Sequence, residues 1–169
     1  ICVASAAPAL WMRDVKISPE GDKIAFGYKG DIYTVPVTGG EARRLTTLPS
    51  YESNPVWSPD GTKIAFASDR HGNFDVFVMD AGGGEATRLT SNSASEIPES
   101  FSPDGKDVFF SAAIQNPASS VMFPSARMTE FYAVPVAGGV SRQVLGTPAQ
   151  MPVFTPDGSR MLYQDVKGF

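Results

Sequence analysis

The sequence predicts an all-β fold, a β-propeller of four-stranded antiparallel blades that is partial, with three complete blades and part of a fourth. The first observation is a phrase, Ser/Thr-Pro-Asp/Glu-Gly, that occurs four times, with its glycines 40, 44 and 53 residues apart. An interval near forty residues is the period of a propeller blade. The second observation is that short β-branched and aromatic runs surround each copy, which is typical of antiparallel strands. No segment shows a sustained helical period.

Each copy of the phrase predicts a tight β-turn between two strands. Proline presets φ, a carboxylate can accept hydrogen bonds from nearby backbone amides, and glycine adopts positive φ at little steric cost. The turn aspartates belong to separate blades, so turn capping explains them better than metal binding. The expected structural turn residues are Pro19, Gly21, Pro59, Asp60, Gly61, Pro103, Asp104, Gly105, Pro156, Asp157 and Gly158.

Four strands are expected in each complete unit. An apolar strand follows each turn, a second strand alternates apolar and polar residues, a third follows a glycine pair, and the residues before the next turn form the fourth. Four strands at this spacing are the content of a propeller blade. The expected strands after each turn are 23–26, 63–66, 107–110 and 160–163; the next are 31–35, 75–79 and 130–134; those after the glycine pairs are 42–46, 86–90 and 141–145; and those before the turns include 55–57 and 152–154.

The blades are expected at about 12–50, 51–94 and 95–149, with an incomplete blade at 150–169. A propeller closes as a ring of typically four to eight blades. An unfinished blade leaves strand edges and apolar surface uncovered, so further blades or another partner are expected to complete the ring.

Residues 1–11 are expected to be a signal-peptide remnant or leader. Ala4 and Ala6 have the small-residue spacing of a cleavage site, which indicates a periplasmic or otherwise exported protein. Cys2 is the only cysteine, and cleavage after Ala6 would leave a chain without cysteine. Such a chain suits an oxidising compartment. The alternative is that Cys2 simply begins the first strand region.

Composition argues against two classes of partner. The net charge is −4, and nucleic-acid binding requires clustered basic residues. Arg43 and Arg44 form the only basic pair, which we interpret as a solvated strand edge. No apolar run approaches the ~20 residues that span a bilayer. We therefore expect neither a nucleic-acid partner nor a membrane span.

The third repeat carries an insertion, at about 113–129, that holds the candidate partner surface. Its residues Met122, Phe123, Arg127 and Met128 include apolar side chains that a free loop does not favour. Insertions in repeat proteins map to loops, often on the binding face. The side chains either fold back onto the propeller, which we favour, or contact a partner.

No catalytic residue, cofactor-binding residue or metal ligand is expected in this chain. The single histidine, His71, stands beside Gly72 in a hairpin turn, whereas a catalytic triad needs a histidine between a carboxylate and a nucleophile. Nucleophile-elbow, zinc-helix and phosphate-loop motifs are missing.

The repeat around residues 58–90 resembles the TolB-type propeller repeat. The residues that carry the resemblance are Ser58-Pro59-Asp60-Gly61 with 63–66, then 68–75, 78–80 and 83–90. This similarity extends over 12–169. The segments 10–15, 30–33 and 163–169, together with the insertion, more narrowly resemble the amino-terminal propeller of tricorn-like serine proteases of the C-terminal-processing type.

The narrower resemblance implies a propeller that gates, filters or docks peptides, in a longer chain with further blades, a PDZ module and a peptidase core. The family's catalytic residues lie in that later domain, so none is carried over to this chain. The alternative is a stand-alone TolB-like scaffold of the cell envelope that binds a protein partner. An accessory propeller of a prolyl peptidase is a more distant alternative.

Overall fold

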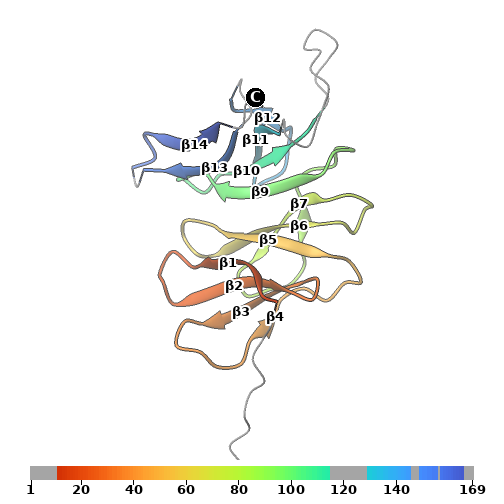
Figure 1. Cartoon of the computed structure of the whole chain (residues 1–169), viewed down its shortest axis with the longest axis vertical. Helices are drawn as coiled ribbons and strands as arrows, with labels where there is room; N and C mark the ends of the chain where they lie inside the picture. The colour runs from red at the N-terminus through yellow and green to blue at the C-terminus, as the bar shows by residue number, and fades with distance from the viewer. Residues whose placement is uncertain (1–10, 115–128, 146–148, 156, 166–169) are drawn as a thin grey trace, which may run out of the picture.

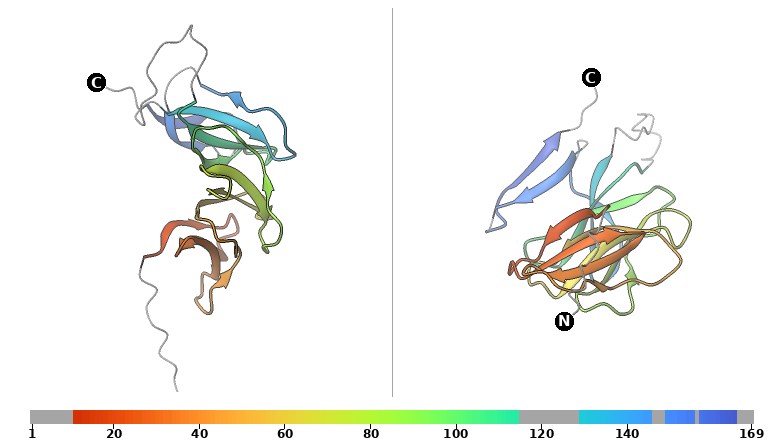
Figure 2. Two further views of the ribbon diagram at one scale, coloured as in Figure 1. Left: turned by 90° about the vertical axis from the view of Figure 1, so that its right-hand side faces the viewer. Right: turned by 60° about the horizontal axis from the view of Figure 1, so that its bottom comes forward.

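The computed structural model describes residues 11–114, 129–145, 149–155 and 157–165. These residues form fourteen strands and no helix, and so contain no helix long and apolar enough to cross a membrane. The strands make three four-stranded antiparallel sheets and one two-stranded sheet, stacked in chain order (Figures 1 and 2). The predicted fold class, a partial propeller of four-stranded blades, is confirmed.

Each four-stranded sheet is built from consecutive strands in sequence order. The first sheet contains β1 (Arg13–Ile17), β2 (Lys23–Tyr28), β3 (Asp31–Pro36) and β4 (Arg43–Arg44); the second β5 (Glu52–Trp57), β6 (Lys63–Ser68), β7 (Asp75–Asp80) and β8 (Thr87–Arg88); the third β9 (Glu96–Phe101), β10 (Asp107–Ala112), β11 (Glu130–Pro135) and β12 (Arg142–Gln143); and the fourth β13 (Ala149–Phe154) and β14 (Met161–Asp165).

The first strands of successive sheets lie next to one another, β1 beside β5, β5 beside β9 and β9 beside β13. The indole Nε1 of Trp57 on β5 donates to the backbone oxygen of Lys16 on β1 at 3.2 Å. Each of these first strands carries a bulge, and in β1, β5 and β13 a residue with positive φ lies in it: Asp14, Asn54 and Met151. The first strands therefore lie together along one side of the stack.

The outermost strands are shorter than the five residues predicted for each, with two residues in β4, β8 and β12. In the first two sheets a threonine hydroxyl takes the place of one backbone acceptor next to these strands. The amide of Leu45 still donates to the oxygen of Ile32 at 2.8 Å, but the amide of Ile32 donates to the hydroxyl of Thr46 at 2.9 Å. Val76 and Thr90 repeat this bond in the second sheet.

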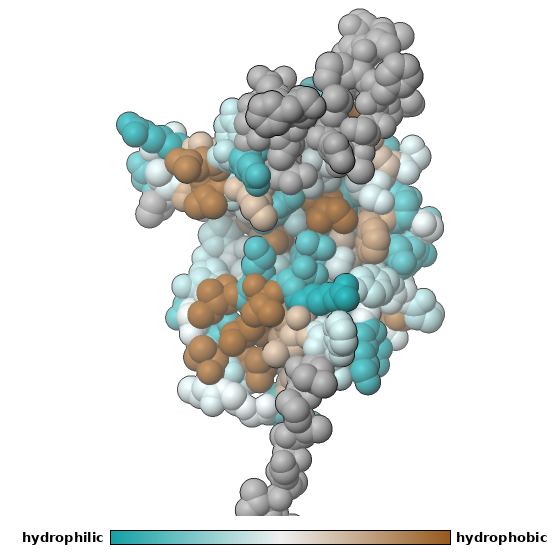
Figure 3. All heavy atoms as spheres, in the orientation of Figure 1, coloured by the Kyte–Doolittle hydropathy of each residue, from teal (hydrophilic) through white to brown (hydrophobic). Residues whose placement is uncertain are grey.

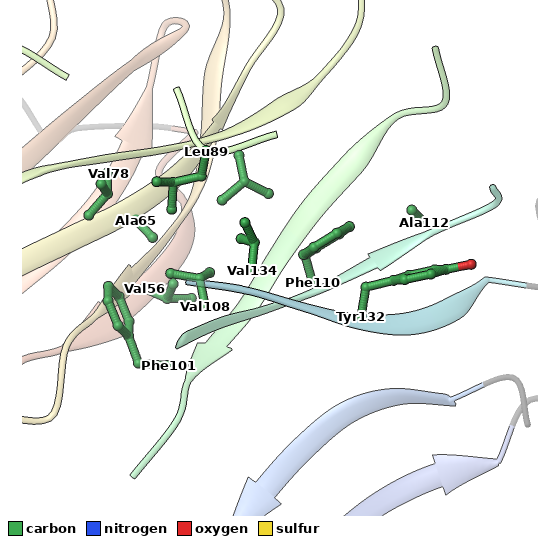
Figure 4. Close-up of a cluster of buried hydrophobic side chains, with 11 residues drawn as sticks. Val56, Ala65, Val78, Leu89, Phe101, Val108, Phe110, Ala112, Tyr132 and Val134 are labelled. Atoms are coloured by element: carbon green, nitrogen blue, oxygen red, sulfur yellow. The ribbon is translucent and has the colours of Figure 1, made fainter. Parts of the chain in front are cut away.

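The core consists of three apolar layers, one between each pair of neighbouring sheets. Each layer combines small and branched residues with large ones, as the middle layer combines Val56 and Ala65 of the second sheet with Phe101 and Phe110 of the third. Figure 4 shows this middle layer, where side chains from the second and third sheets converge. The layer between the first two sheets contains Ala25, Ile32, Leu45, Ile64, Phe66, Phe77 and Met79, and the last contains Phe109, Phe131, Ala133 and Ala149.

Apolar side chains are exposed on both end sheets of the stack. Val15 and Ile17 on β1 are 54% and 60% exposed, and Val153 and Leu162 on the fourth sheet 66% and 75%. Figure 3 shows apolar surface over both regions.

The four repeated turns share one geometry. The glycine amide donates to the oxygen of the residue three positions earlier, as Gly61 does to Ser58 at 2.9 Å, and all four glycines have φ between 67° and 72°. In the last three copies a carboxylate accepts from the first hydroxyl, as Asp60 does from Ser58 at 2.6 Å. In the first copy Asp22 replaces Glu20 as the acceptor from Ser18.

The turns also contact one another from sheet to sheet. A Cβ placed on Gly105 would lie 3.7 Å from the Cδ of Pro59, and one on Gly158 would lie 2.9 Å from the Cβ of Pro103. The proline of one turn thus packs beside the glycine of the next. The motif therefore has a second role, because its glycine also leaves room for the preceding proline.

Candidate functional site

The predicted partner surface, Met122, Phe123, Arg127 and Met128, lies outside the described residues, as do Pro156 and residues 1–10. The other predicted turn residues are described, and they lie in the repeated turns above. These turns lie at one end of the strands. The opposite end of the strands carries the β2–β3 and β6–β7 hairpins and the connections between sheets. The candidate site is found there.

His71 lies at the β6–β7 hairpin and is exposed. The hairpin closes through the amide of Gly72, which donates to the oxygen of Asp69 at 2.8 Å. The imidazole stacks on Phe77, with ring centroids 6.0 Å apart and planes 15° apart. Packing on the hairpin explains the position of this histidine.

A polar cluster joins the first sheet to the second. A guanidinium nitrogen of Arg44 lies 2.7 Å from Oδ2 of Asp31, and the hydroxyl of Thr46 donates to Oδ1 of the same carboxylate at 3.1 Å. The backbone continues the connection, because the amide of Glu52 donates to the oxygen of Gly30 at 2.8 Å. Arg44 is interpreted from the sequence as a solvated strand-edge residue. It also forms an ion pair with Asp31 at the junction of the two sheets.

The same cluster recurs between the second and third sheets. Arg88 lies 2.7 Å from Oδ2 of Asp75, whose side chain is fully buried. Burial raises the pKa of the Asp75 carboxyl, and the positive charge of Arg88 opposes this shift. Burial also raises the pKa of Glu96, while hydrogen bonds from Thr90 and from the Asn92 amide lower it. The negative charge of Asp75 raises the Glu96 pKa further. This junction therefore contains two buried carboxylates, those of Asp75 and Glu96, and one arginine, Arg88, that can balance their charge.

Sequence reasoning missed these clusters, although the sequence contains their signal. The residues Asp31, Arg44, Thr46 and Glu52 each recur 44 residues later, as Asp75, Arg88, Thr90 and Glu96. In the third repeat the corresponding positions are Glu130, Gln143, Leu145 and Ala149. These four positions of the third repeat therefore carry one acid and neither arginine nor threonine, and Ala149 lies in an apolar layer.

An open cleft of about 570 Å³ lies beside the first junction. Its walls come from the start of β1, from the β2–β3 hairpin and from the segment that leads into β5. The hairpin loop is Lys29-Gly30, with φ of 52° and 87°, which fits the two-residue turns that favour tight hairpins. The lining residues are Trp11, Arg13, Asp14, Gly27, Tyr28, Lys29, Gly30, Tyr51 and Glu52.

Glu52 is the buried carboxylate of this cleft. Its side chain is fully buried, and its Oε1 accepts from the hydroxyls of Ser50 at 2.5 Å and Ser68 at 3.0 Å. Arg70 donates to the same oxygen at 3.3 Å. The other oxygen, Oε2, is buried and has no hydrogen-bond partner. Buried polar atoms are nearly always paired, so this oxygen is an unsatisfied buried acceptor in a residue that lines the cleft.

The cleft also carries aromatic and charged groups near solvent. Trp11 is 79% exposed and Tyr51 is 42% exposed. The ammonium of Lys29 lies 5.3 Å from the centroid of the Tyr28 ring. Asp14 accepts from the amide of Asn54 at 3.3 Å, which fixes one wall against β5. The cleft thus combines aromatic side chains with charged groups. Among the described residues, no group of three or more His, Cys, Asp or Glu could hold a metal ion.

Comparison with known proteins gives consistent similarities. Residues 9–168 match the family described as the tricorn protease N-terminal beta propeller domain. Tricorn protease homolog 1 of Streptomyces coelicolor is 39% identical over 54 residues, which is 32% of this chain and 5% of that protein. The TolB homolog of Chlorobium luteolum is 42% identical over 57 residues, 34% of this chain and 12% of that protein.

Solved structures show the same fold. A TolB-type structure from Agrobacterium tumefaciens superposes with a TM-score of 0.71 and 28% identity, over 92% of this chain and 55% of that one. The tricorn protease superposes with a TM-score of 0.56 and 14% identity, over 74% of this chain and 14% of that one. The chain covers between 5% and 23% of the length of four curated relatives that it matches, the Streptomyces coelicolor and Chlorobium luteolum proteins among them.

Proposed function

Because the chain belongs to the family of tricorn protease N-terminal propeller domains, we propose that it is the non-catalytic propeller of a tricorn-like serine peptidase and docks, filters or gates peptides. The observation that carries the proposal is the family match over 9–168. The open cleft beside the first junction supports it, since concave sites with aromatic walls and a few polar groups are typical of binding sites.

The proposal includes a longer polypeptide with further blades, a PDZ module and a peptidase core. Its further blades would cover the exposed apolar faces of the end sheets, where Val15, Ile17, Val153 and Leu162 lie. Neighbouring sheets of the stack bury the equivalent faces in apolar layers. Similarity to TolB proteins supports a periplasmic or otherwise exported location.

The test is a measurement on the full-length protein from its source cell. Its intact mass is determined, and hydrolysis of unstructured peptides is followed with and without a serine-directed inhibitor. A product several times larger than 18.0 kDa with inhibitor-sensitive hydrolysis supports the proposal. A product without hydrolytic activity contradicts it.

A second candidate function is a TolB-like scaffold that binds a protein partner in the cell envelope. The observation that favours it is the TolB-type structure, which at 28% identity covers 92% of this chain. The same measurement separates the two functions, because a scaffold lacks serine-dependent hydrolysis even when its ring is complete.

A further inference from the structure

We propose that the cleft at the β2–β3 hairpin selects peptides with an arginine or lysine side chain, and that Oε2 of Glu52 accepts a hydrogen bond from the cationic group. The inference rests on the proposed peptide-docking function and specifies its ligand. It assigns a site separate from the predicted surface at Met122 and Phe123.

The first argument is the unpaired oxygen of Glu52. Ser50, Ser68 and Arg70 all donate to Oε1, while Oε2 is buried without a donor. A buried acceptor without a partner keeps its desolvation cost, which a donor entering from the cleft removes. A guanidinium or ammonium donor forms the stronger, charge-assisted bond to a carboxylate.

The second argument is the chemistry of the walls. The aromatic side chains Trp11, Tyr28 and Tyr51 line the same cleft, and cations are attracted to the faces of such rings. The protein already shows this contact, because the Lys29 ammonium lies 5.3 Å from the Tyr28 ring centroid. Arginine stacks on aromatic rings particularly well, since its guanidinium is planar.

The third argument is charge. The whole chain has a net charge of −4, which attracts cationic ligands. Arg13 and Lys29 also line the cleft, but both side chains are exposed to solvent. Arg70 already pairs with Oε1 of Glu52, so the attraction for a ligand cation comes from the unpaired Oε2. Solvent and salt screen the exposed charges of Arg13 and Lys29 more than they screen this buried group.

The chain contains a matched control for Glu52. Glu96 occupies the corresponding position at the next junction, 44 residues later, and is buried to a similar degree, with 2% exposure against 1%. Its Oε2 accepts from the amide of Asn92, and it does not line the cleft. A Glu96→Gln variant therefore reproduces the loss of a buried junction charge without altering the proposed site.

The experiment measures the binding of three peptides to the full-length protein by calorimetry, with any hydrolysis blocked by a serine-directed inhibitor. The peptides are acetylated and amidated five-residue chains of glycine and serine with arginine, citrulline or norleucine at the centre. We expect the arginine peptide to bind about tenfold or more tightly than the citrulline peptide, because only guanidinium carries a charge. Glu52→Gln is expected to remove most of this preference, and Glu96→Gln to retain it.

Equal binding of the arginine and citrulline peptides to the unmodified protein would overturn the inference, and this comparison requires no variant to fold. A preference that survives Glu52→Gln would overturn it as well. In both cases peptide docking stands and only its assigned chemistry fails. If no peptide binds while serine-dependent hydrolysis is present, both the docking role and the inference fail, but the tricorn-like assignment does not.

Discussion

The buried ion pair at the second junction allows a quantitative prediction for Arg88→Met. Asp75 is fully buried, and its Oδ2 lies 2.7 Å from a guanidinium nitrogen of Arg88, while Oδ1 has no hydrogen-bond partner. Methionine retains much of the length of the arginine side chain and removes its charge. The variant therefore leaves a buried carboxylate without its counter-ion.

The expected cost follows from the geometry. At 2.7 Å and an effective dielectric constant of 20, the attraction is about 6 kcal/mol before desolvation is counted. Removing one partner of a buried pair costs about 3–5 kcal/mol. Because the Arg88 side chain is 33% exposed, the lower end, about 3 kcal/mol, is expected. The exposed pair Lys63–Asp80, at 2.9 Å, is the control, and Lys63→Met is expected to cost no more than about 1 kcal/mol.

The assay is urea unfolding of the full-length protein at pH 8 and pH 5, followed by amide hydrogen exchange of β6 and β7 in the second sheet. Burial raises the pKa of Asp75 above its ordinary value, so its ionised form destabilises the fold above the folded-state pKa. This cost disappears as the pH falls toward the unfolded-state pKa. The deficit of Arg88→Met is therefore expected to be smaller at pH 5, and Asp75→Asn in the same chain is expected to recover part of it.

Equal losses in the free energy of unfolding for Arg88→Met and Lys63→Met would refute the reasoning, because burial would then not distinguish the two ion pairs. A stability loss of Arg88→Met that is larger at pH 5 than at pH 8 would refute the expected direction of the pH dependence.

Three further predictions concern the turns and the first hairpin. Gly158→Ala is expected to destabilise the β13–β14 hairpin by about 1–3 kcal/mol more than Gly21→Ala destabilises its own turn, measured by amide hydrogen exchange. Both glycines have positive φ, but only the Cβ at 158 would overlap Pro103, at 2.9 Å; equal losses would contradict this. The hydroxyl of Ser102 is the main cause that lowers the pKa of Asp104 to about 2, so this carboxylate contributes stability above its ordinary value of 3.8 that is lost as the pH falls toward 2. Asp104→Asn is expected to reduce that acid-dependent loss in thermal unfolding, and an unchanged pH profile would count against it. Lys29→Asn is expected to raise stability by about 0.5 kcal/mol in urea unfolding, because asparagine tolerates φ of 52° better than lysine; a lower stability would contradict the turn geometry.

The repeat alone predicts the class of fold, and the physical reason is local. Proline, aspartate and glycine in one phrase favour a turn whatever surrounds them, and short β-branched runs on either side favour strands. Gly61 and Gly105 show the positive φ that such a turn requires. The observed strand bounds differ from the expected ones at several places: β5 begins at Glu52 and not at 55, and the outermost strands are shorter than expected. In the first two sheets the hydroxyls of Thr46 and Thr90 replace a backbone acceptor beside the outermost strand. Propensity does not reveal that exchange, because it depends on the neighbouring strand.

The sequence by itself determined the blade repeat and the family resemblance. Only the tertiary structure decided which polar residues meet between blades. Asp75 and Arg88 are thirteen positions apart, yet their side chains lie 2.7 Å apart because β7 and β8 pair in one sheet. Glu52 becomes the wall of a cleft because the connection between two sheets places it beside Tyr28 and Trp11. Local chemistry specifies turns and strands, whereas a binding site depends on which distant segments the packing brings together.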